Sequence, residues 1–173
     1  MYEKGKNDLL IKPTKIIVYI AIGALFAFMG GIVYYSTLDF PELEKAEIKL
    51  AGVEVTDVNS IENHITLKTS LLITNHGERT FVIPIITYEH FVNGKLIGNA
   101  SYNVEDIPMT GRAPFFPGVE INLETYLKLY LTEENRDVYL AIINGEHVKH
   151  SIKGQFTVET AWQLVEKSFE SSL

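Results

Sequence analysis

The sequence has no cysteine among its 173 residues. Disulfide bonds, thiolate metal sites, cysteine nucleophiles and a lipid-modified cysteine are therefore excluded, and an exported fold must rely on its apolar core. P-loop, G-x-S-x-G and G-x-G-x-x-G motifs are also missing from the sequence. We therefore predict a protein that is not an enzyme and has no catalytic residues, cofactor or metal.

Basic residues are in the minority, with 15 Lys and Arg against 22 Asp and Glu. Residues 1–15 differ, with a formal net charge of +2, so the rest of the chain has a net charge of −9. An acidic domain repels phosphate backbones, because nucleic-acid binding needs a basic surface that releases counterions. We expect no nucleic-acid partner.

Charge is absent from residues 16–35, which read IIVYIAIGALFAFMGGIVYY. A helix of this length rises about 30 Å, the thickness of the hydrocarbon core of a bilayer. Lysines precede the run, Tyr34 and Tyr35 close it, and the acidic segment STLDFPELEK follows it. The positive-inside rule then predicts a single-pass anchor in the cell membrane, with residues 1–15 in the cytoplasm and the C-terminal part outside it. The alternative is a cleaved signal peptide, although no A-x-A site follows the run.

One face of the predicted membrane helix has small side chains. Gly23, Ala27 and Gly31 recur at every fourth position, and Gly30 lies beside them. Small residues at this spacing let two helix backbones come close together in lipid. The predicted partners are the bilayer and, through this stripe, another membrane protein or a second copy of the chain. The alternative is that glycine and alanine are simply frequent in membrane helices.

About 138 residues remain after the anchor, which is the size of one ordinary domain. We predict a linker over residues 36–46 and an extracytoplasmic domain over residues 47–173. Apolar residues alternate along Ile65–Thr74, as in a strand with one buried face, and Asn93-Gly94 is typical of a two-residue hairpin turn. About seven such strands predict a mainly β protein, an antiparallel β-sandwich rather than a barrel.

Further strands are expected over residues 47–58, 80–92, 119–131 and 147–159. One short helix is expected over residues 132–143, because Thr132 can cap its start and Gly145 can end it. The tail from Trp162 fits either a helix face or a returning strand.

The order of these features resembles the late embryogenesis abundant group 2 family, also called the water stress and hypersensitive response (WHy) domain. The resemblance runs from about Ile48 to Phe169 and rests on LKTSLLITNHGERTF, YEHFVNGKLIG, EINLETYLKL and SIKGQFTVETAW. His76 departs from it, because the family usually has proline after the residue that corresponds to Asn75. The resemblance implies a fibronectin type III-like sandwich, a C-terminal strand, and a protective or interaction role without an established active site.

Two pairs of residues are further candidates. Phe115 and Phe116 lie between two prolines in a predicted loop, where they form a possible interaction loop or cover the open end of the sandwich. His147 and His150 have a spacing found in metal sites, but on a strand an odd separation sends them to opposite faces. We therefore predict no metal site there.

The tether, the acidic β domain and the missing catalytic motifs together predict a non-enzymatic, membrane-tethered interaction or stress-protection module. The alternative is an accessory single-pass subunit of a membrane-embedded enzyme, such as an oxidase or monooxygenase, or of a secretion complex. In that case Gly23, Ala27 and Gly31 would dock the helix.

Overall fold

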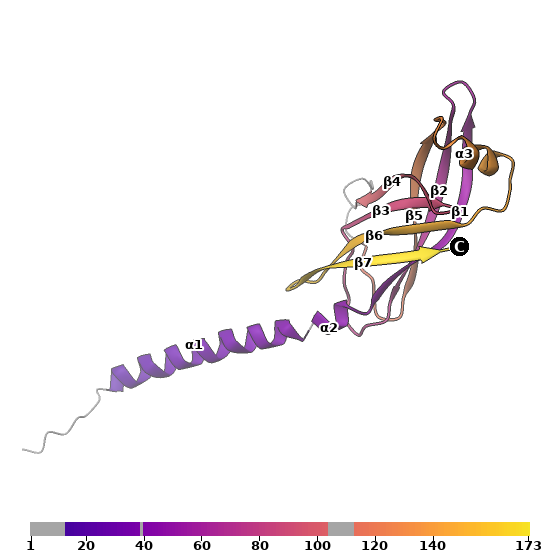
Figure 1. The fold of residues 1–173 in the computed structure, drawn as a ribbon. Coiled ribbons are helices and arrows are strands. Elements are labelled where there is room, and N and C mark those ends of the chain that lie inside the picture. Colours follow the sequence, from indigo (N-terminus) through magenta and orange to yellow (C-terminus); the bar gives the residue numbers. More distant parts are fainter. Residues whose placement is uncertain (1–12, 39, 104–112) are drawn as a thin grey trace, which may run out of the picture. The chain divides into compact units, whose positions relative to one another are not determined.

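The structure is a computed structural model that describes residues 13–38, 40–103 and 113–173. It divides into two compact units, Met1–Leu38 and Asp39–Leu173. In the first unit the described residues form helix α1 (Pro13–Thr37), which contains the expected apolar run (Figure 1). Within Lys15–Leu43 an 18-residue window has a mean hydropathy of 2.5, so this helix is long and apolar enough to cross a membrane. The lysines of residues 1–12 lie outside the described residues.

The second unit opens with a short helix, α2 (Phe40–Leu43). We expected a linker over residues 36–46, but Leu43 and Ala46 are buried in the core of the domain. Residues 40–46 therefore belong to the folded domain. A helix of one turn has no apolar period that a sequence pattern could reveal.

The first sheet of the domain has three antiparallel strands in the order β1-β2-β5. Its strands are β1 (Ala46–Asn59), β2 (His64–Asn75) and β5 (Glu120–Tyr130). The inner face of β2 is apolar at alternate positions, as the pattern predicted. Register shifts between Leu50 and Gly52 and between Val55 and Asp57 interrupt β1, which is an edge strand.

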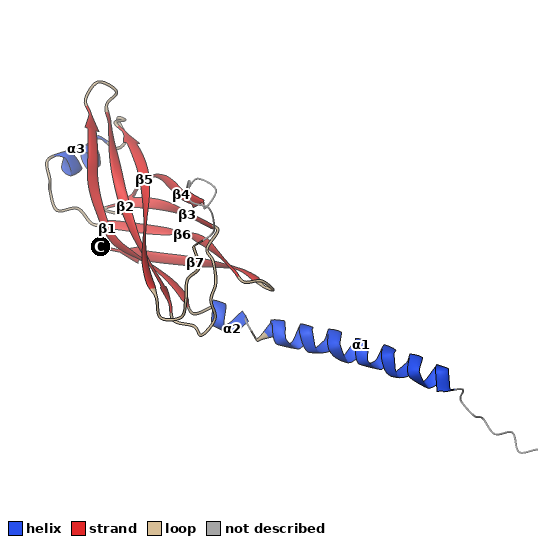
Figure 2. Ribbon diagram, turned by 180° about the vertical axis from the view of Figure 1, so that it is seen from behind, coloured by secondary structure: helices blue, strands red, loops and turns tan. Residues whose placement is uncertain are grey.

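The second sheet has four antiparallel strands in the order β4-β3-β6-β7. Its strands are β3 (Ile85–Val92), β4 (Lys95–Asn103), β6 (His150–Glu159) and β7 (Leu164–Ser172). Asn93 and Gly94 join β3 to β4 with φ angles of 52° and 82°, which confirms the predicted hairpin turn. The C-terminal tail is a strand. The strands of the two sheets cross in Figures 1 and 2, and this order of strands confirms the expected mainly β, fibronectin type III-like sandwich.

Helix α3 (Arg136–Ile143) lies between β5 and β6 in the chain and begins four residues later than expected. The residues before it form a turn, because Thr132 and Asn135 each accept a hydrogen bond from the other's backbone N–H, at 3.2 and 2.8 Å. Gly145 ends the helix with φ +70°, as predicted. The helix buries Val138, Tyr139 and Ile142.

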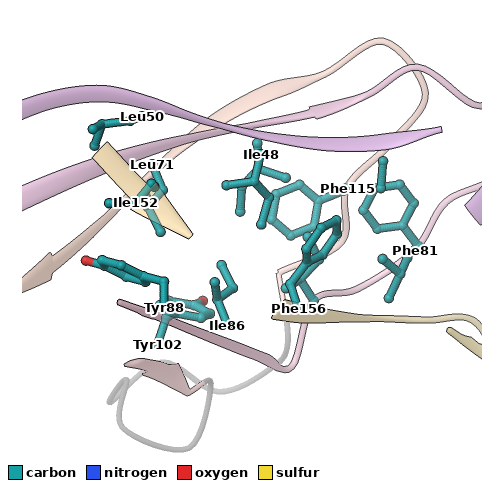
Figure 3. Packing of buried hydrophobic residues seen from close by; sticks show 14 of the residues in the cluster. Ile48, Leu50, Leu71, Phe81, Ile86, Tyr88, Tyr102, Phe115, Ile152 and Phe156 are labelled. Carbon is teal, nitrogen blue, oxygen red and sulfur yellow. The ribbon is translucent and has the colours of Figure 1, made fainter. Parts of the chain in front are cut away.

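The core consists of two apolar clusters. The first fills the space between the sheets, where Phe81, Phe115 and Phe156 gather near Ile48 while Leu50, Leu71 and Ile152 lie farther along (Figure 3). The second lies under α3 and includes Ile65, Leu67, Val92 and Leu129. Successive inner positions of β2, β3 and β5 belong first to one cluster and then to the other.

Strand β7 is also attached to the start of β1, although the two strands belong to different sheets. The Lys167 ammonium donates to the backbone carbonyls of Glu44 and Ala46, the latter at 2.7 Å. Ser171 Oγ accepts a hydrogen bond of 3.0 Å from the backbone N–H of Leu50. Burial lowers the pKa of Lys167, which also lies 5.7 Å from the centre of the Phe156 ring. These contacts close one side of the sandwich.

Candidate functional site

A band of polar side chains divides the two apolar clusters. Thr69 of β2, Thr125 of β5 and His90 of β3 form this polar band, and all three are buried at inner positions between residues of the two clusters. The hydroxyls of Tyr88 and Thr125 share a hydrogen bond, and Thr125 also donates to the Thr69 carbonyl at 3.4 Å. Burial raises the pKa of Tyr88, so its hydroxyl stays protonated at neutral pH.

Like Thr69, His90 has no exposed surface. Its Nε2 lies 3.0 Å from Nδ1 of His150, and the two rings meet edge to face with centroids 5.2 Å apart. Its Nδ1 has no hydrogen-bond partner among the described residues. Burial, and to a smaller extent the positive charge that His150 can carry, lowers the pKa of His90 to about 4. Burial also lowers the pKa of His150, so both rings are neutral at pH 7 and one donates to the other.

This pair corrects the interpretation of His147 and His150. We expected a strand from His147, but β6 begins at His150, because the backbone of Lys149 is hydrogen-bonded to Asn93 of the hairpin turn. His150 therefore meets His90 and not His147. The described residues hold no group of three or more metal-ligating side chains. Sequence reasoning missed His90, although its alternation with Tyr88 on β3 could have placed it inside.

Acidification from pH 6.5 toward pH 4 is expected to destabilise the domain through His90. In this range the unfolded chain binds a proton that the folded chain does not, because burial lowers the pKa of His90 from 6.5 to about 4. The free energy of unfolding therefore falls as the pH is lowered, and the full loss of about 3 kcal/mol is reached below pH 4. Urea unfolding of the full chain in detergent, followed by circular dichroism at several pH values, measures this slope.

Measurements above pH 4.5 distinguish the effect of His90 on stability from the effect of the carboxylates. Glu42 and Glu47 have pKa values held below 4.5 by Lys45 and Lys49, so their stabilisation is present above that pH and is lost only below it. His90→Leu should reduce the slope between pH 6.5 and pH 4.5, and the part that remains is expected from His150, whose pKa is also lowered by burial. His147→Ala, which changes an exposed histidine, should keep the wild-type slope. An unchanged slope in His90→Leu would contradict this role of the buried ring.

The outer face of the four-stranded sheet has a hollow of about 600 Å³, which we call the outer hollow. The exposed side chains that line it come from all four strands: Thr87, Glu89, Asn99, Ser101, Lys153, Gln155 and Ser168. These residues alternate along the strands with core residues such as Tyr88. Each strand therefore places its apolar side chains in the core and its polar side chains on the outer face.

The register of the strands arranges these side chains in two rows. One row crosses the sheet as hydroxyl and amide groups in the order Ser101, Thr87, Gln155 and Ser168. The second row begins with the amide Asn99 and continues with the charged residues Glu89 and Lys153, beyond which Glu170 follows outside the hollow. Directly opposed residues of a sheet are close enough to act on one ligand together.

Chemically, the outer hollow is an array of hydrogen-bond donors and acceptors. Glu89 and Lys153 are cross-strand neighbours, yet neither forms an ion pair with a residue that the structure describes. An acidic and a basic group side by side are then available to an external ligand. Such a surface suits recognition of a polar partner. The sequence signal for it was the polar half of each alternating strand, which we had used only to find the core.

The two aromatic residues of the predicted interaction loop are separated by the fold. Phe115 is buried and stacks on Phe81, with ring centroids 5.6 Å apart, whereas Phe116 is exposed. The prediction that Phe115 belongs to an interaction loop is therefore wrong. The backbone of Phe115 forms an isolated bridge with Phe81, and its side chain points into the core. Gly23, Ala27, Gly30 and Gly31 all lie in α1, and none belongs to the outer hollow.

No family model and no curated protein matches the sequence. Solved structures with a similar fold include a protein from Archaeoglobus fulgidus, 15% identical over 73% of this chain and 92% of that one, with a TM-score of 0.45. A structural-genomics target is 11% identical over 74% of this chain and 86% of that one, with a TM-score of 0.48. A protein from Arabidopsis thaliana is 13% identical over 73% and 80% respectively, with a TM-score of 0.45. Similarities at this level assign no function.

Proposed function

We propose that the protein is a non-enzymatic, membrane-tethered interaction module whose sandwich is displayed outside the cytoplasm. The observation that supports this proposal is that an exposed apolar helix is followed directly by a folded domain. Helix α1 is apolar and exposed along its length, and after Thr37 only two residues precede α2, the first element of a domain with its own core. The helix needs lipid to cover it and the domain does not. The charge difference across the helix in the sequence supports the orientation.

The outer hollow supports the interaction part of this proposal. It offers hydroxyl, amide and charged groups from four strands, and these groups come from rigid elements rather than from loops. The resemblance to the group 2 late embryogenesis abundant family supports a protective version, in which the domain shields a client or the membrane zone during water stress. If cells that lack the protein survive drying as well as wild-type cells do, the protective version fails.

Purification of the full chain from native membranes in a mild detergent tests the module. Ser101→Trp places a large side chain in the outer hollow, and Asn122→Trp places the same side chain at an exposed position of β5 in the other sheet. We expect partners to be recovered with the wild type and with Asn122→Trp, and to be lost with Ser101→Trp. If the same partners are recovered with all three chains, the outer hollow is not the binding surface. If the wild-type chain is released from membranes without detergent, the proposed tether is wrong.

The second candidate function is that of an accessory subunit of a membrane-embedded enzyme or secretion complex. The observation that favours it lies in α1, where a Cβ added at Gly23, Gly30 or Gly31 would meet no described atom. Because these residues and Ala27 share one face of the helix, a second membrane helix has room to pack there.

Ala27→Ile is expected to disrupt such a complex, because the larger side chain separates the packed backbones. The affinity should fall by about tenfold, because close packing of the two backbones depends on small residues at these positions. The size of the complex on a native gel measures this. Ala21→Ile is the matched control, because Ala21 lies about 120° around the helix from Ala27. If Ala27→Ile leaves the size of the complex unchanged, the subunit role loses its support.

A further inference from the structure

Large apolar side chains are exposed at one end of the sandwich. Phe40 in α2, Phe116 before β5, Trp162 in the β6–β7 turn and Leu164 at the start of β7 are 47, 54, 60 and 65% exposed. We call these four residues the apolar rim. They come from three segments that are far apart in the sequence, so they do not arise from one hydrophobic run.

The topology brings these three segments to the same end. The register pairs the start of β1 with the end of β2, the end of β2 with the start of β5, and the end of β6 with the start of β7. Isolated bridges continue this end of the domain, from Phe115 to Phe81 and from Val82 to Glu159. Figures 1 and 2 both show α2 and the β6–β7 turn at the end of the domain away from the β1–β2 turn.

The chain also enters the domain at this end. Only two residues separate the end of α1 at Thr37 from Phe40, and the three steps from Thr37 to Phe40 span at most about 11 Å. If α1 crosses a bilayer, connectivity alone keeps the apolar rim close to the lipid headgroups. The opposite end has no such connection, because Ile61, which is 93% exposed, lies in the turn beyond the far end of the 14-residue strand β1.

Two of the acidic side chains near the entry point, those of Glu42 and Glu47, have lysine counterions. Glu42 pairs with Lys45 at 2.6 Å, and Glu47 pairs with Lys49 at 3.0 Å. This end of the acidic domain is therefore less negative than its count of carboxylates suggests. Repulsion from lipid phosphates is reduced by these pairs.

We propose that the apolar rim seats on the lipid bilayer, with Trp162 in the headgroup zone and Phe40, Phe116 and Leu164 against the upper acyl chains. Tryptophan prefers this zone because its ring is amphipathic, and exposed phenylalanine and leucine gain free energy when lipid replaces water around them. The domain is then held against the membrane at several points and not only by its tether. The inference rests on the proposed membrane tether and adds a defined lipid-contact surface to it.

Trp162 is the only tryptophan of the chain, so its fluorescence reports on this contact directly. The full chain is reconstituted in vesicles of phosphatidylcholine, with and without brominated acyl chains, and is then sedimented. We expect a blue-shifted emission that brominated lipid quenches by about half or more, because the ring lies in the interfacial zone. The quenching should change little with salt, because the proposed contacts of the rim are apolar and are not screened by ions.

A matched variant moves the reporter to the opposite end of the domain. The double variant Trp162→Phe/Ile61→Trp should sediment with the vesicles but show a water-exposed emission without quenching. Phe40→Ser/Phe116→Ser, which keeps Trp162, should reduce the quenching at least about twofold, because two of the lipid contacts are gone.

Three results would overturn the inference. If the chain sediments with vesicles while Trp162 stays water-exposed and unquenched, the tether stands and the seating is wrong. If the emission is blue-shifted but brominated lipid does not quench it, protein covers the rim in place of lipid. If the chain does not sediment with vesicles, the tether fails and the seating fails with it.

Discussion

Gly154→Ala is expected to cause a large loss of stability in the sandwich. Gly154 lies on the inner face of β6, directly opposite Tyr88 of β3 and Phe169 of β7. A Cβ at this position would overlap the carbonyl oxygen of Thr87 and would lie 2.6 and 2.7 Å from Cβ and Cα of Tyr88. Because these neighbours are mainly backbone atoms of a central strand, they cannot rotate away. We expect a loss of about 3 kcal/mol or more in the free energy of unfolding.

Urea unfolding of the full chain in detergent, combined with limited proteolysis of the domain, measures this loss. Gly52→Ala is the matched control, because a Cβ at Gly52 of β1 would meet nothing within 4 Å. That variant should change the free energy of unfolding by no more than about 0.5 kcal/mol. Wild-type stability in Gly154→Ala would show that β3 and β6 can separate locally, contrary to the packing described above.

Phe115→Ala is expected to produce the second large loss, about 3–5 kcal/mol in the free energy of unfolding. The side chain is 2% exposed, and its ring stacks on Phe81 at an interplanar angle of 18° in the first apolar cluster. Truncation removes this contact and leaves a cavity that the surrounding strands cannot fill by collapsing.

The neighbouring residue provides the comparison. Phe116→Ala changes the same residue type one position later in the chain, at a side chain that is 54% exposed. In detergent we expect a change of less than about 0.5 kcal/mol. Thermal or urea unfolding of both variants measures the difference. Equal losses would mean that the two phenylalanines share one environment, contrary to their burial.

The elements with a regular apolar period could be predicted from the sequence. Alternation along β2 places Ile65, Leu67, Leu71 and Ile73 on one buried face, and the structure has all four at 0% exposure. Asn93-Gly94 could be assigned to a hairpin turn because few residue pairs tolerate two positive φ angles. The helix α1 could be predicted from the length of its uncharged apolar run alone.

The remaining features depend on contacts between segments that are far apart in the sequence. Leu43 looks like part of a linker until the strands that bury it are in place. The start of β6 at His150 is set by bonds between Lys149 and Asn93, a residue of another hairpin. The outer hollow depends on the register of four strands, because Glu89 and Lys153 become neighbours only when β3 pairs with β6. The alternation in a single sequence decides which face of a strand is buried, but it does not identify which residues of two distant strands stand opposite each other.

The bonds from Lys167 and Ser171 to the start of β1 have a mechanical consequence for a tethered protein. If α1 anchors the protein in a membrane, as we propose, a pull on α1 acts on the chain just before Ala46, where it would otherwise peel β1 from β2 one hydrogen bond at a time. The Lys167 ammonium holds the carbonyls of Glu44 and Ala46 at that point, so the tension passes also into β7, in the other sheet. Both sheets then resist the force together, so β1 does not detach from β2 before β7 has taken up part of the tension.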